Sequence, residues 1–310
     1  MSARASTAQA RDSAMFEHDA GPGARSRTAA AVRSSALSAP KRSPVDAQAI
    51  GPRLLAFACA QLQDARSHLS GSGEDPHAGI HQARKCIRRA RAALALGARA
   101  LDRRAAGLDD ELRRLCRGMA GLRDAQALLD ELQRLEQSAP ARLRALLPLA
   151  ETAARQRRDQ VLAQALAKDP AFAARRQRLL AAQARFARLD WQAVDDIDVA
   201  AATARSRRRV DKARARARRH PEDDHLWHVY RRRLRRLRQQ DTLLAQVQPG
   251  LRPSTSGLDD HDALGESQDD ALLLRRCGKG SPFPPGEQRI LLRNLARARL
   301  RRTRTGDANA

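Results

Sequence analysis

The sequence has few aromatic residues and no long apolar run. Aromatic side chains make up only 3% of its 310 residues. Proteins that bind single-stranded nucleic acid usually stack bases on such side chains, so this scarcity favours an anionic ligand without bases. No run of about 18 or more apolar residues occurs, so we expect no membrane span. The N-terminal region also lacks the continuous apolar segment of a secretory signal peptide, and we expect a cytoplasmic protein.

Cysteine is scarce as well, and its four positions do not form a metal-binding pattern. Cys59, Cys86, Cys116 and Cys277 are scattered, whereas a zinc site needs pairs at short spacing. We therefore expect reduced thiols, no metal and no other cofactor. The segment 278–281 (Gly-Lys-Gly-Ser) lacks the upstream glycine of a phosphate-binding loop, and no serine or cysteine has a recognisable catalytic context. These observations predict that the protein is not an enzyme.

Acidic residues and lysine are both outnumbered by arginine. Only five of the 59 basic residues are lysines, and the formal net charge is +24. A chain of this charge attracts polyanions. Guanidinium groups also bind phosphate oxygens in pairs, so the arginine bias favours a phosphate-rich partner. A genome that favours arginine codons would explain part of the count, but not its arrangement.

The arginines are concentrated in a segment that occurs twice. Residues 81–91 read HQARKCIRRAR and residues 228–238 read HVYRRRLRRLR, so both fit H-x-x-R-[KR]-x-[IL]-R-R-x-R. On a helix, at about 100° per residue, each copy separates a basic stripe from an apolar stripe. The apolar stripes are Ile80, Ala83, Ile87, Ala90 and Leu94, and Trp227, Tyr230, Leu234 and Leu237. The basic stripes, which we predict to bind a polyanion, are His81, Arg84, Lys85, Arg88 and Arg91, and His228, Arg231, Arg232, Arg235 and Arg238.

The rest of the chain has helical periodicity and no strand-like alternation. Residues 1–47 have the composition of a disordered basic tail. A tandem duplication explains the two histidine helices, and it predicts a first four-helix bundle at about 48–192 and a second at about 193–305. The predicted helices are one through Leu54 to Ala65, then 75–100, 108–137, 141–189 with a break at Pro170, 199–219, the His228 helix ending near 248, 258–274 and 287–302.

These residues together resemble the CHAD domain, the conserved-histidine α-helical domain family. The two histidine helices, their spacing and the segment Leu122-Arg123-Asp124 carry the resemblance, which covers roughly residues 50–303. It implies two pseudo-symmetric four-helix bundles whose basic helices face a central groove or pore. It also implies that the two basic stripes bind inorganic polyphosphate and, in many bacteria, that the protein associates with polyphosphate granules.

The chain departs from the family pattern in three places. Gln239 follows Arg238 where the family usually has arginine and then tyrosine, and Gln268-Asp269 stands where Arg-Asp is typical. The triphosphatase-like barrel that often accompanies CHAD domains is absent from this sequence. The first two departures put the contribution of the second half in question, and the third removes the main reason to expect catalysis.

We therefore expect a bacterial polyphosphate-binding protein with a granule-associated or regulatory role. Basic helices also bind nucleic-acid backbones without sequence preference, so weak nucleic-acid binding is the main alternative. An enzyme that processes polyphosphate or triphosphate is a third reading, and it would need a metal-binding carboxylate cluster that the sequence does not show. His81 and His228 would gain charge on protonation, which predicts tighter binding toward acidic pH. The oligomeric state stays open.

Overall fold

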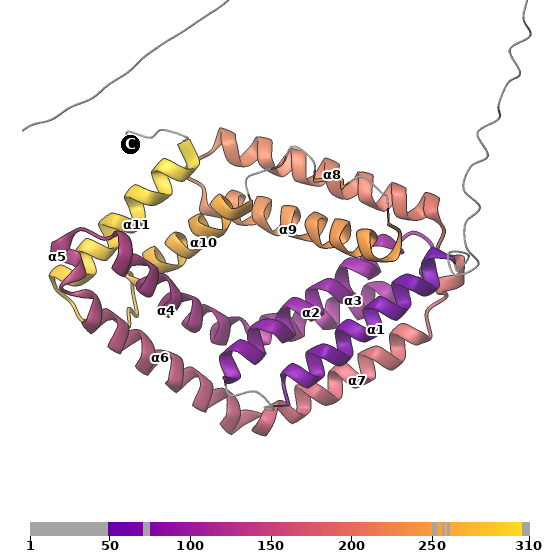
Figure 1. Ribbon diagram of the computed structural model, residues 1–310, viewed down its shortest axis with the longest axis horizontal. Coiled ribbons are helices and arrows are strands. Elements are labelled where there is room, and N and C mark those ends of the chain that lie inside the picture. The colour runs from indigo at the N-terminus through magenta and orange to yellow at the C-terminus, as the bar shows by residue number, and fades with distance from the viewer. Residues whose placement is uncertain (1–48, 71–74, 250–252, 256–257, 259–260, 306–310) are drawn as a thin grey trace, which may run out of the picture. The chain divides into compact units, whose positions relative to one another are not determined.

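The computed structural model describes residues 49–70, 75–249, 253–255, 258 and 261–305. The predicted tail at 1–47 lies outside the described residues. Every regular element within those ranges is helical, with no strand, so the predicted all-α class is confirmed (Figure 1). None of these helices is long and apolar enough to cross a membrane.

The helices follow the order that the periodicity predicts. The first two are α1 (Ile50–His68) and α2 (Pro76–Leu96), and α2 carries the first basic stripe. The second basic stripe lies on α9 (Asp224–Val247). The remaining elements are α3 (Arg103–Gly118), α4 (Ala120–Ser138), α5 (Ala141–Arg144), α6 (Leu147–Lys168), η2 (Pro170–Phe172), α7 (Ala173–Ala187), η3 (Trp191–Ala193), α8 (Asp196–Arg219), α10 (His261–Arg276) and α11 (Glu287–Thr305).

Both basic helices begin at an aspartate that caps the first turn. The Asp75 side chain accepts a hydrogen bond from the backbone N–H of His77 at 2.9 Å, and Pro76 occupies the first helical position. At the start of α9, Asp223 accepts from the backbone N–H of His225 at 2.8 Å. The caps fix where each helix begins and therefore which face carries the basic stripe.

One predicted helix proves to be two. The expected continuous helix at 108–137 breaks at Met119, which has φ −106° and ψ 9° and ends α3 before α4 begins. Gly118 and Gly121, which have low helix propensity, flank the break. The Met119 side chain is fully buried, so core packing holds the backbone in this bend. The break allows α4 to leave the direction of α3.

The predicted break at Pro170 is confirmed. Ala171 and Phe172 have φ values of 47° and 52°, which a continuing right-handed helix excludes. Phe172 is buried, and Asp169 accepts a hydrogen bond from the backbone N–H of Ala174 at 2.8 Å. The bend between α6 and α7 is therefore stabilised both by a buried aromatic side chain and by a cap.

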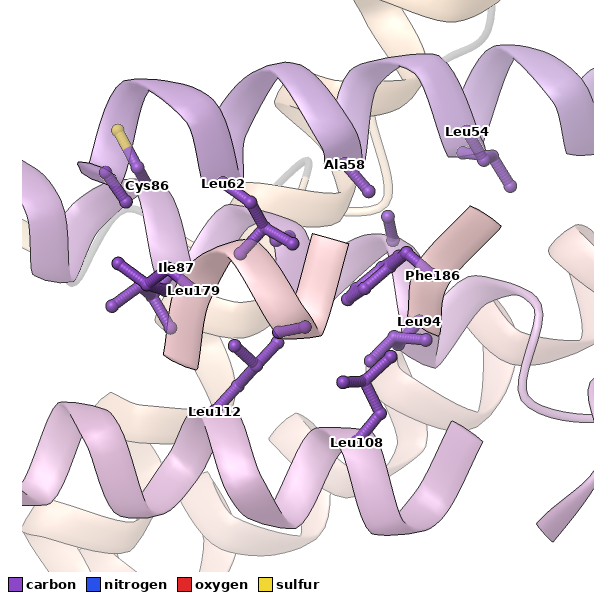
Figure 2. Packing of buried hydrophobic residues seen from close by; sticks show 14 of the residues in the cluster. Leu54, Ala58, Leu62, Cys86, Ile87, Leu94, Leu108, Leu112, Leu179 and Phe186 are labelled. Atoms are coloured by element: carbon purple, nitrogen blue, oxygen red, sulfur yellow. The ribbon is translucent and has the colours of Figure 1, made fainter. Parts of the chain in front are cut away.

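The largest hydrophobic cluster joins α1, α2, α3 and α7, together with the end of α9. Figure 2 shows Leu54 and Leu62 of α1 facing Leu94 of α2, Leu112 of α3 and Phe186 of α7. Every residue of the two predicted apolar stripes is buried, both on α2, where the stripe begins at Ile80, and on α9, where it begins at Trp227. Burial of these stripes fixes the rotation of α2 and α9 about their axes.

Two further clusters form the remainder of the core. One joins α4, α5 and α6 with α10 and α11, and includes Leu132, Phe283 and Leu292. The other joins α8 to α9 through residues such as Val210 and Tyr230. The first and second of the three clusters therefore combine helices from both predicted halves, and the boundary near residue 192 stays a prediction.

The contacts between helices repeat along the chain. The pair α1 and α2 corresponds to α8 and α9, and the pair α4 and α6 corresponds to α10 and α11. The helices that the motifs make equivalent also contact each other, since α2 packs against α9 and α4 against α10 (Figure 1). This is the pattern that a duplicated chain with approximate twofold symmetry would produce, and it brings the two basic helices together.

Candidate anion-binding site

Five arginines from three helices form what we call the central arginine cluster. Arg84 and Arg88 come from α2, Arg231 and Arg235 from the contacting helix α9, and Arg123 from α4. All five are partly buried. Four of them belong to the predicted basic stripes. The packing of α2 against α9 brings Arg84 and Arg88 of one stripe close to Arg231 and Arg235 of the other.

The charges in this cluster oppose one another. Burial, followed by the charges of Arg84, Arg123 and Arg231, lowers the pKa of Arg88 to about 10. Burial and the neighbouring charges of Arg88 and Arg231 lower the pKa of Arg235 to about 9. Because arginine keeps its proton in proteins, these shifts express how unfavourable it is to bury these cations and to place them close together. An anion bound here would relieve that repulsion.

The central members of the cluster have no acidic partner. Neither Arg88 nor Arg235 pairs with a carboxylate among the residues that the structure describes. The Nε–H groups of Arg84 and Arg88 are buried without a hydrogen-bond acceptor. Buried donors of this kind are costly, and the rest of the fold must offset that cost.

The cluster is bounded on one side by Asp109 of α3. Arg91 donates from Nε and Nη2 to the two carboxylate oxygens of Asp109, both at 2.9 Å. Arg236 of α9 lies 3.7 Å from the same carboxylate and donates to the backbone carbonyl of Arg91 at 3.3 Å. Arg91, a member of the predicted stripe, is therefore paired with a carboxylate, and its role in ligand binding stays a prediction.

A second carboxylate bounds the cluster where α4 meets α10. Asp269 accepts from Arg123 at 3.4 Å and from Arg134 at 3.0 Å. Arg123 also lies 3.6 Å from Asp124. The charge of Arg123 is therefore partly compensated by two carboxylates, whereas the charges of Arg88 and Arg235 are not.

Arg84 and Arg238 are held by backbone carbonyl groups. Arg84 donates to the carbonyl oxygen of Cys116 at the end of α3. Arg238 donates to the carbonyl oxygen of Leu258 at 2.8 Å. A carbonyl group orients a guanidinium without cancelling its charge, so both arginines remain cationic elements of the site.

The two histidines differ in their surroundings. Partial desolvation, then the charges of Arg88 and Arg123, lower the pKa of His81, although the residue as a whole is exposed. His228 Nδ1 forms a hydrogen bond of 2.7 Å with Oε1 of Gln268. Desolvation also lowers the pKa of His228, and the bond to Gln268 opposes that shift. Both rings are therefore mainly neutral at pH 7 in the absence of a ligand.

Lys85 and Arg232 occupy equivalent positions beside the histidines. Lys85 is partly buried and Arg232 is exposed. Their charges contribute to the lowered pKa of His81 and of His228, respectively. The structure thus brings Arg84, Arg88, Arg231 and Arg235 together, places Lys85 and Arg232 at the same face, and diverts Arg91 to Asp109.

Arg123 is the site residue that the basic stripes did not predict. It lies on α4, outside both histidine helices, and its charge lowers the pKa of His81, Arg84 and Arg88. The available signal was the Leu122-Arg123-Asp124 segment. Helical periodicity identifies residues that share one helix face, but it does not show which other helix supplies a further side chain.

A buried ionic network lies beside the cluster. Glu131 of α4 is fully buried and pairs with Arg134 at 2.6 Å and with Arg299 at 3.2 Å. Arg299 also lies 3.2 Å from the buried Asp270. Burial raises the pKa of Glu131 to about 7 and that of Asp270 to about 6, against the opposing effect of the arginines. Within the described ranges, no three His, Cys, Asp or Glu side chains are arranged to hold a metal ion.

The four cysteine thiols are free, and no disulfide joins them. Cys86, Cys116 and Cys277 are buried, and Cys59 is partly buried. Burial raises the pKa of each thiol. Thiols of this kind are poor nucleophiles at neutral pH.

Comparison with models of known families gives a match to the CHAD domain over residues 55–277, which includes both basic helices. The chain belongs to the CHAD domain family. The predicted resemblance is therefore confirmed. No curated protein matches the sequence.

Two solved structures share the CHAD fold of this chain. PptA from Streptomyces chartreusis is 21% identical, with a TM-score of 0.58 over 84% of this chain and 99% of that one. The CHAD domain from the plant Ricinus communis is 20% identical, with a TM-score of 0.55 over 83% of this chain and 91% of that one. At these identities, the likeness establishes the fold alone.

Proposed function

We propose that this CHAD protein binds inorganic polyphosphate at the central arginine cluster. The observation that supports this most strongly is the convergence of five arginines in which Arg88 and Arg235 have no carboxylate partner in the described part of the chain. Buried guanidinium groups with unpaired donors need a multivalent anion. Family membership supports the same ligand class, because CHAD domains are associated with polyphosphate.

Polyphosphate suits the chemistry of the cluster. It is a flexible polyanion with negative charge on every phosphate, so successive phosphates can meet guanidinium groups from α2, α4 and α9 in turn. Each arginine offers paired N–H donors that match phosphate oxygens. Release of condensed counterions adds a favourable, salt-dependent contribution, as it does for nucleic-acid backbones.

The aromatic residues of the second basic helix are committed to the core. Tyr230 is fully buried, and Trp227 donates its indole N–H to the carbonyl oxygen of Pro221 at 3.1 Å. Neither ring offers a platform for base stacking on the face that carries Arg231 and Arg235. This favours polyphosphate over single-stranded nucleic acid as the ligand.

We further propose a binding role rather than catalysis. Asp124 and Asp269, which contact the cluster, are paired with Arg123, and Asp109 beside it is paired with Arg91. Such pairing removes them from roles as a general base or metal ligand. A granule-associated or regulatory protein in a bacterial cytoplasm would use binding of this kind.

The test compares two double variants that remove equal charge from the same helices. Arg88→Gln/Arg235→Gln removes the two central cations. The control, Arg89→Gln/Arg233→Gln, changes neighbouring arginines that bond to Gln61 and to the carbonyl of Arg209. Affinity for long-chain polyphosphate and for duplex DNA is measured by fluorescence anisotropy across a range of salt concentrations.

We expect the central variant to lose about 100-fold in polyphosphate affinity, because each charge-assisted contact is worth about 1.5–3 kcal/mol. The control should lose little. Equal losses in both variants would show that only net charge matters, and stronger binding of DNA than of polyphosphate would favour the nucleic-acid alternative. Release of phosphate from polyphosphate by the wild type with Mg²⁺ or Mn²⁺ would contradict the non-catalytic role.

A further inference from the structure

A second series of cations lies on the outer side of α8, and we call it the α8 cation file. Each member lies three or four residues from another member, so all six share one side of the helix. Five of the six are exposed, and Arg205 is partly buried. The buried residues of α8, such as Val210 and Ala213, lie on a different side and pack against α9. The file consists of Arg205, Arg208, Arg209, Lys212, Arg216 and Arg219.

The charges of this file are not compensated. None of its six members pairs with a carboxylate in the ranges that the structure describes. Arg207, on the opposite flank of the same helix, does form such a pair, with Asp211 at 3.1 Å. An ordinary solvated helix face mixes both signs of charge, as that flank does. The file instead presents one sign of charge from Arg205 to Arg219.

The α8 cation file passes next to α9, the helix that carries Arg231 and Arg235 of the central arginine cluster. Arg233 of α9 donates to the backbone carbonyl of Arg209 at 3.0 Å, so α8 and α9 are in direct contact at this point. Burial, and then the charges of Arg91 and Arg209, lower the pKa of Arg236. Arg236 in turn approaches Arg91 and Asp109. Cations therefore continue from the cluster, past Asp109, to α8.

We propose that the α8 cation file is a second binding surface for the same polyphosphate chain, occupied by the part that extends beyond Asp109. This inference rests on the proposed function of the central cluster. Asp109 interrupts the positive path where it neutralises Arg91, and so separates an inner, partly buried site from an outer, exposed one. Short chains would fill only the inner site.

The length of the file makes the two sites distinguishable. From Arg205 to Arg219 the helix rises about 21 Å at about 1.5 Å per residue. A chain must therefore be long to occupy both sites at once. The outer contacts are exposed to solvent and screened by salt, whereas the inner ones are partly buried and screened less. The outer surface should add affinity for long chains mainly at low ionic strength.

The test uses a triple variant of the file and a control with the same charge loss. Arg208→Gln/Lys212→Gln/Arg216→Gln removes exposed cations and keeps good helix formers at each position. The control is Arg157→Gln/Lys168→Gln/Arg188→Gln, three exposed cations on α6 and at the end of α7. Binding of tripolyphosphate, long-chain polyphosphate and duplex DNA to the full chain is measured at several salt concentrations.

For long-chain polyphosphate we expect the α8 variant to lose about fivefold to tenfold in affinity. Its slope of log affinity against log salt should fall by about 2, since roughly 0.7 counterions are released per contact on a single-stranded polyanion. Tripolyphosphate affinity should stay unchanged. Identical behaviour of the α8 and control variants would overturn the inference, as would loss of DNA binding alone. Failure of the wild type to bind any polyphosphate would instead reject the proposed function.

Discussion

The two basic helices carry the same motif, yet their surroundings differ. On the α2 side, His81 makes no side-chain hydrogen bond to a described residue, and Arg123 of α4 stands nearby. On the α9 side, Gln268 of α10 occupies the place of that arginine in the motif and binds His228. The first half therefore supplies an additional cation where the second supplies a neutral amide. The two sides share equivalent helix contacts, while the Arg123 and Gln268 positions make the site unequal.

The last arginine of each motif shows a related difference. Arg91 is neutralised by Asp109, whereas Arg238 is oriented by the carbonyl of Leu258 and keeps its charge. The α2 side thus gains a cation at Arg123 and loses one at Arg91. On the α2 side the unpaired positive charge therefore lies closer to α4, whereas on the α9 side it extends along α9 itself. Single substitutions at these positions alter the differences one at a time.

The largest effect is expected from exchanging the residues that distinguish α4 from α10. Arg123→Gln should lower polyphosphate affinity about tenfold, because it removes a charge-assisted contact worth about 1.5–3 kcal/mol. Gln268→Arg should raise affinity about twofold to threefold, a smaller change because Asp269 would share the new charge. Calorimetric titration measures both. The double exchange conserves net charge and serves as the control. An unchanged affinity in each single variant would show that neither Arg123 nor Gln268 influences binding.

A second effect concerns the buried acids next to the cluster. A Glu131 pKa of about 7 lies above its unfolded value, so the folded state holds the proton more tightly and stability falls as pH rises from 6 to 8. The loss should be about 1 kcal/mol, or about fivefold in the unfolding equilibrium. Urea unfolding at both pH values measures it. Glu131→Gln should flatten the dependence, while the exposed control Glu136→Gln should preserve it; a wild type without pH dependence would contradict this assignment.

Removing the carboxylate that bounds the site should strengthen binding. Asp109→Asn frees Arg91 and Arg236, and we expect about threefold higher affinity for long-chain polyphosphate and a steeper salt slope by about 0.7. The matched control is Asp110→Asn, which changes the next residue and an exposed pair with Arg113 at 2.6 Å. If Asp109→Asn weakened binding, the carboxylate would be a structural clamp needed to hold α2, α3 and α9 in place.

The smallest effect should come from the histidines. Their lowered pKa values leave both rings mainly neutral at pH 7, and a bound anion would favour the protonated form. Affinity should therefore rise about twofold from pH 8 to pH 6, with uptake of protons on binding. His81→Gln should remove more of this change than His228→Gln, because Gln268 already engages one nitrogen of His228. A flat titration of the wild type would exclude a role for both rings.

Much of the fold could be predicted from local patterns. Helix faces follow from periodicity. The sequence therefore predicts that Ile87 and Leu234 are buried and that Arg88 and Arg235 lie on a different face of each helix. Capping at Asp75 and the break at Pro170 follow from the chemistry of single residues. The bend at Met119 could not be predicted in this way, because it depends on burial of that side chain in a core formed by distant helices.

The candidate site shows the same limit. The sequence identified arginines on two helices, but not which of them would meet an acid. Asp109 and Gln268 contact the basic helices only because α3 and α10 pack there, and those contacts depend on tertiary structure. Arg123 was visible within a family motif, although periodicity along α2 and α9 gave no reason to place it beside them.

The most direct test of the central claim is a crystal structure of the full chain with long-chain polyphosphate. The account predicts phosphate groups within hydrogen-bond distance of the guanidinium groups of both Arg88 and Arg235, with Arg123 contacting the same chain. Phosphates found only on outer surfaces, with Arg88 and Arg235 unliganded, would contradict it.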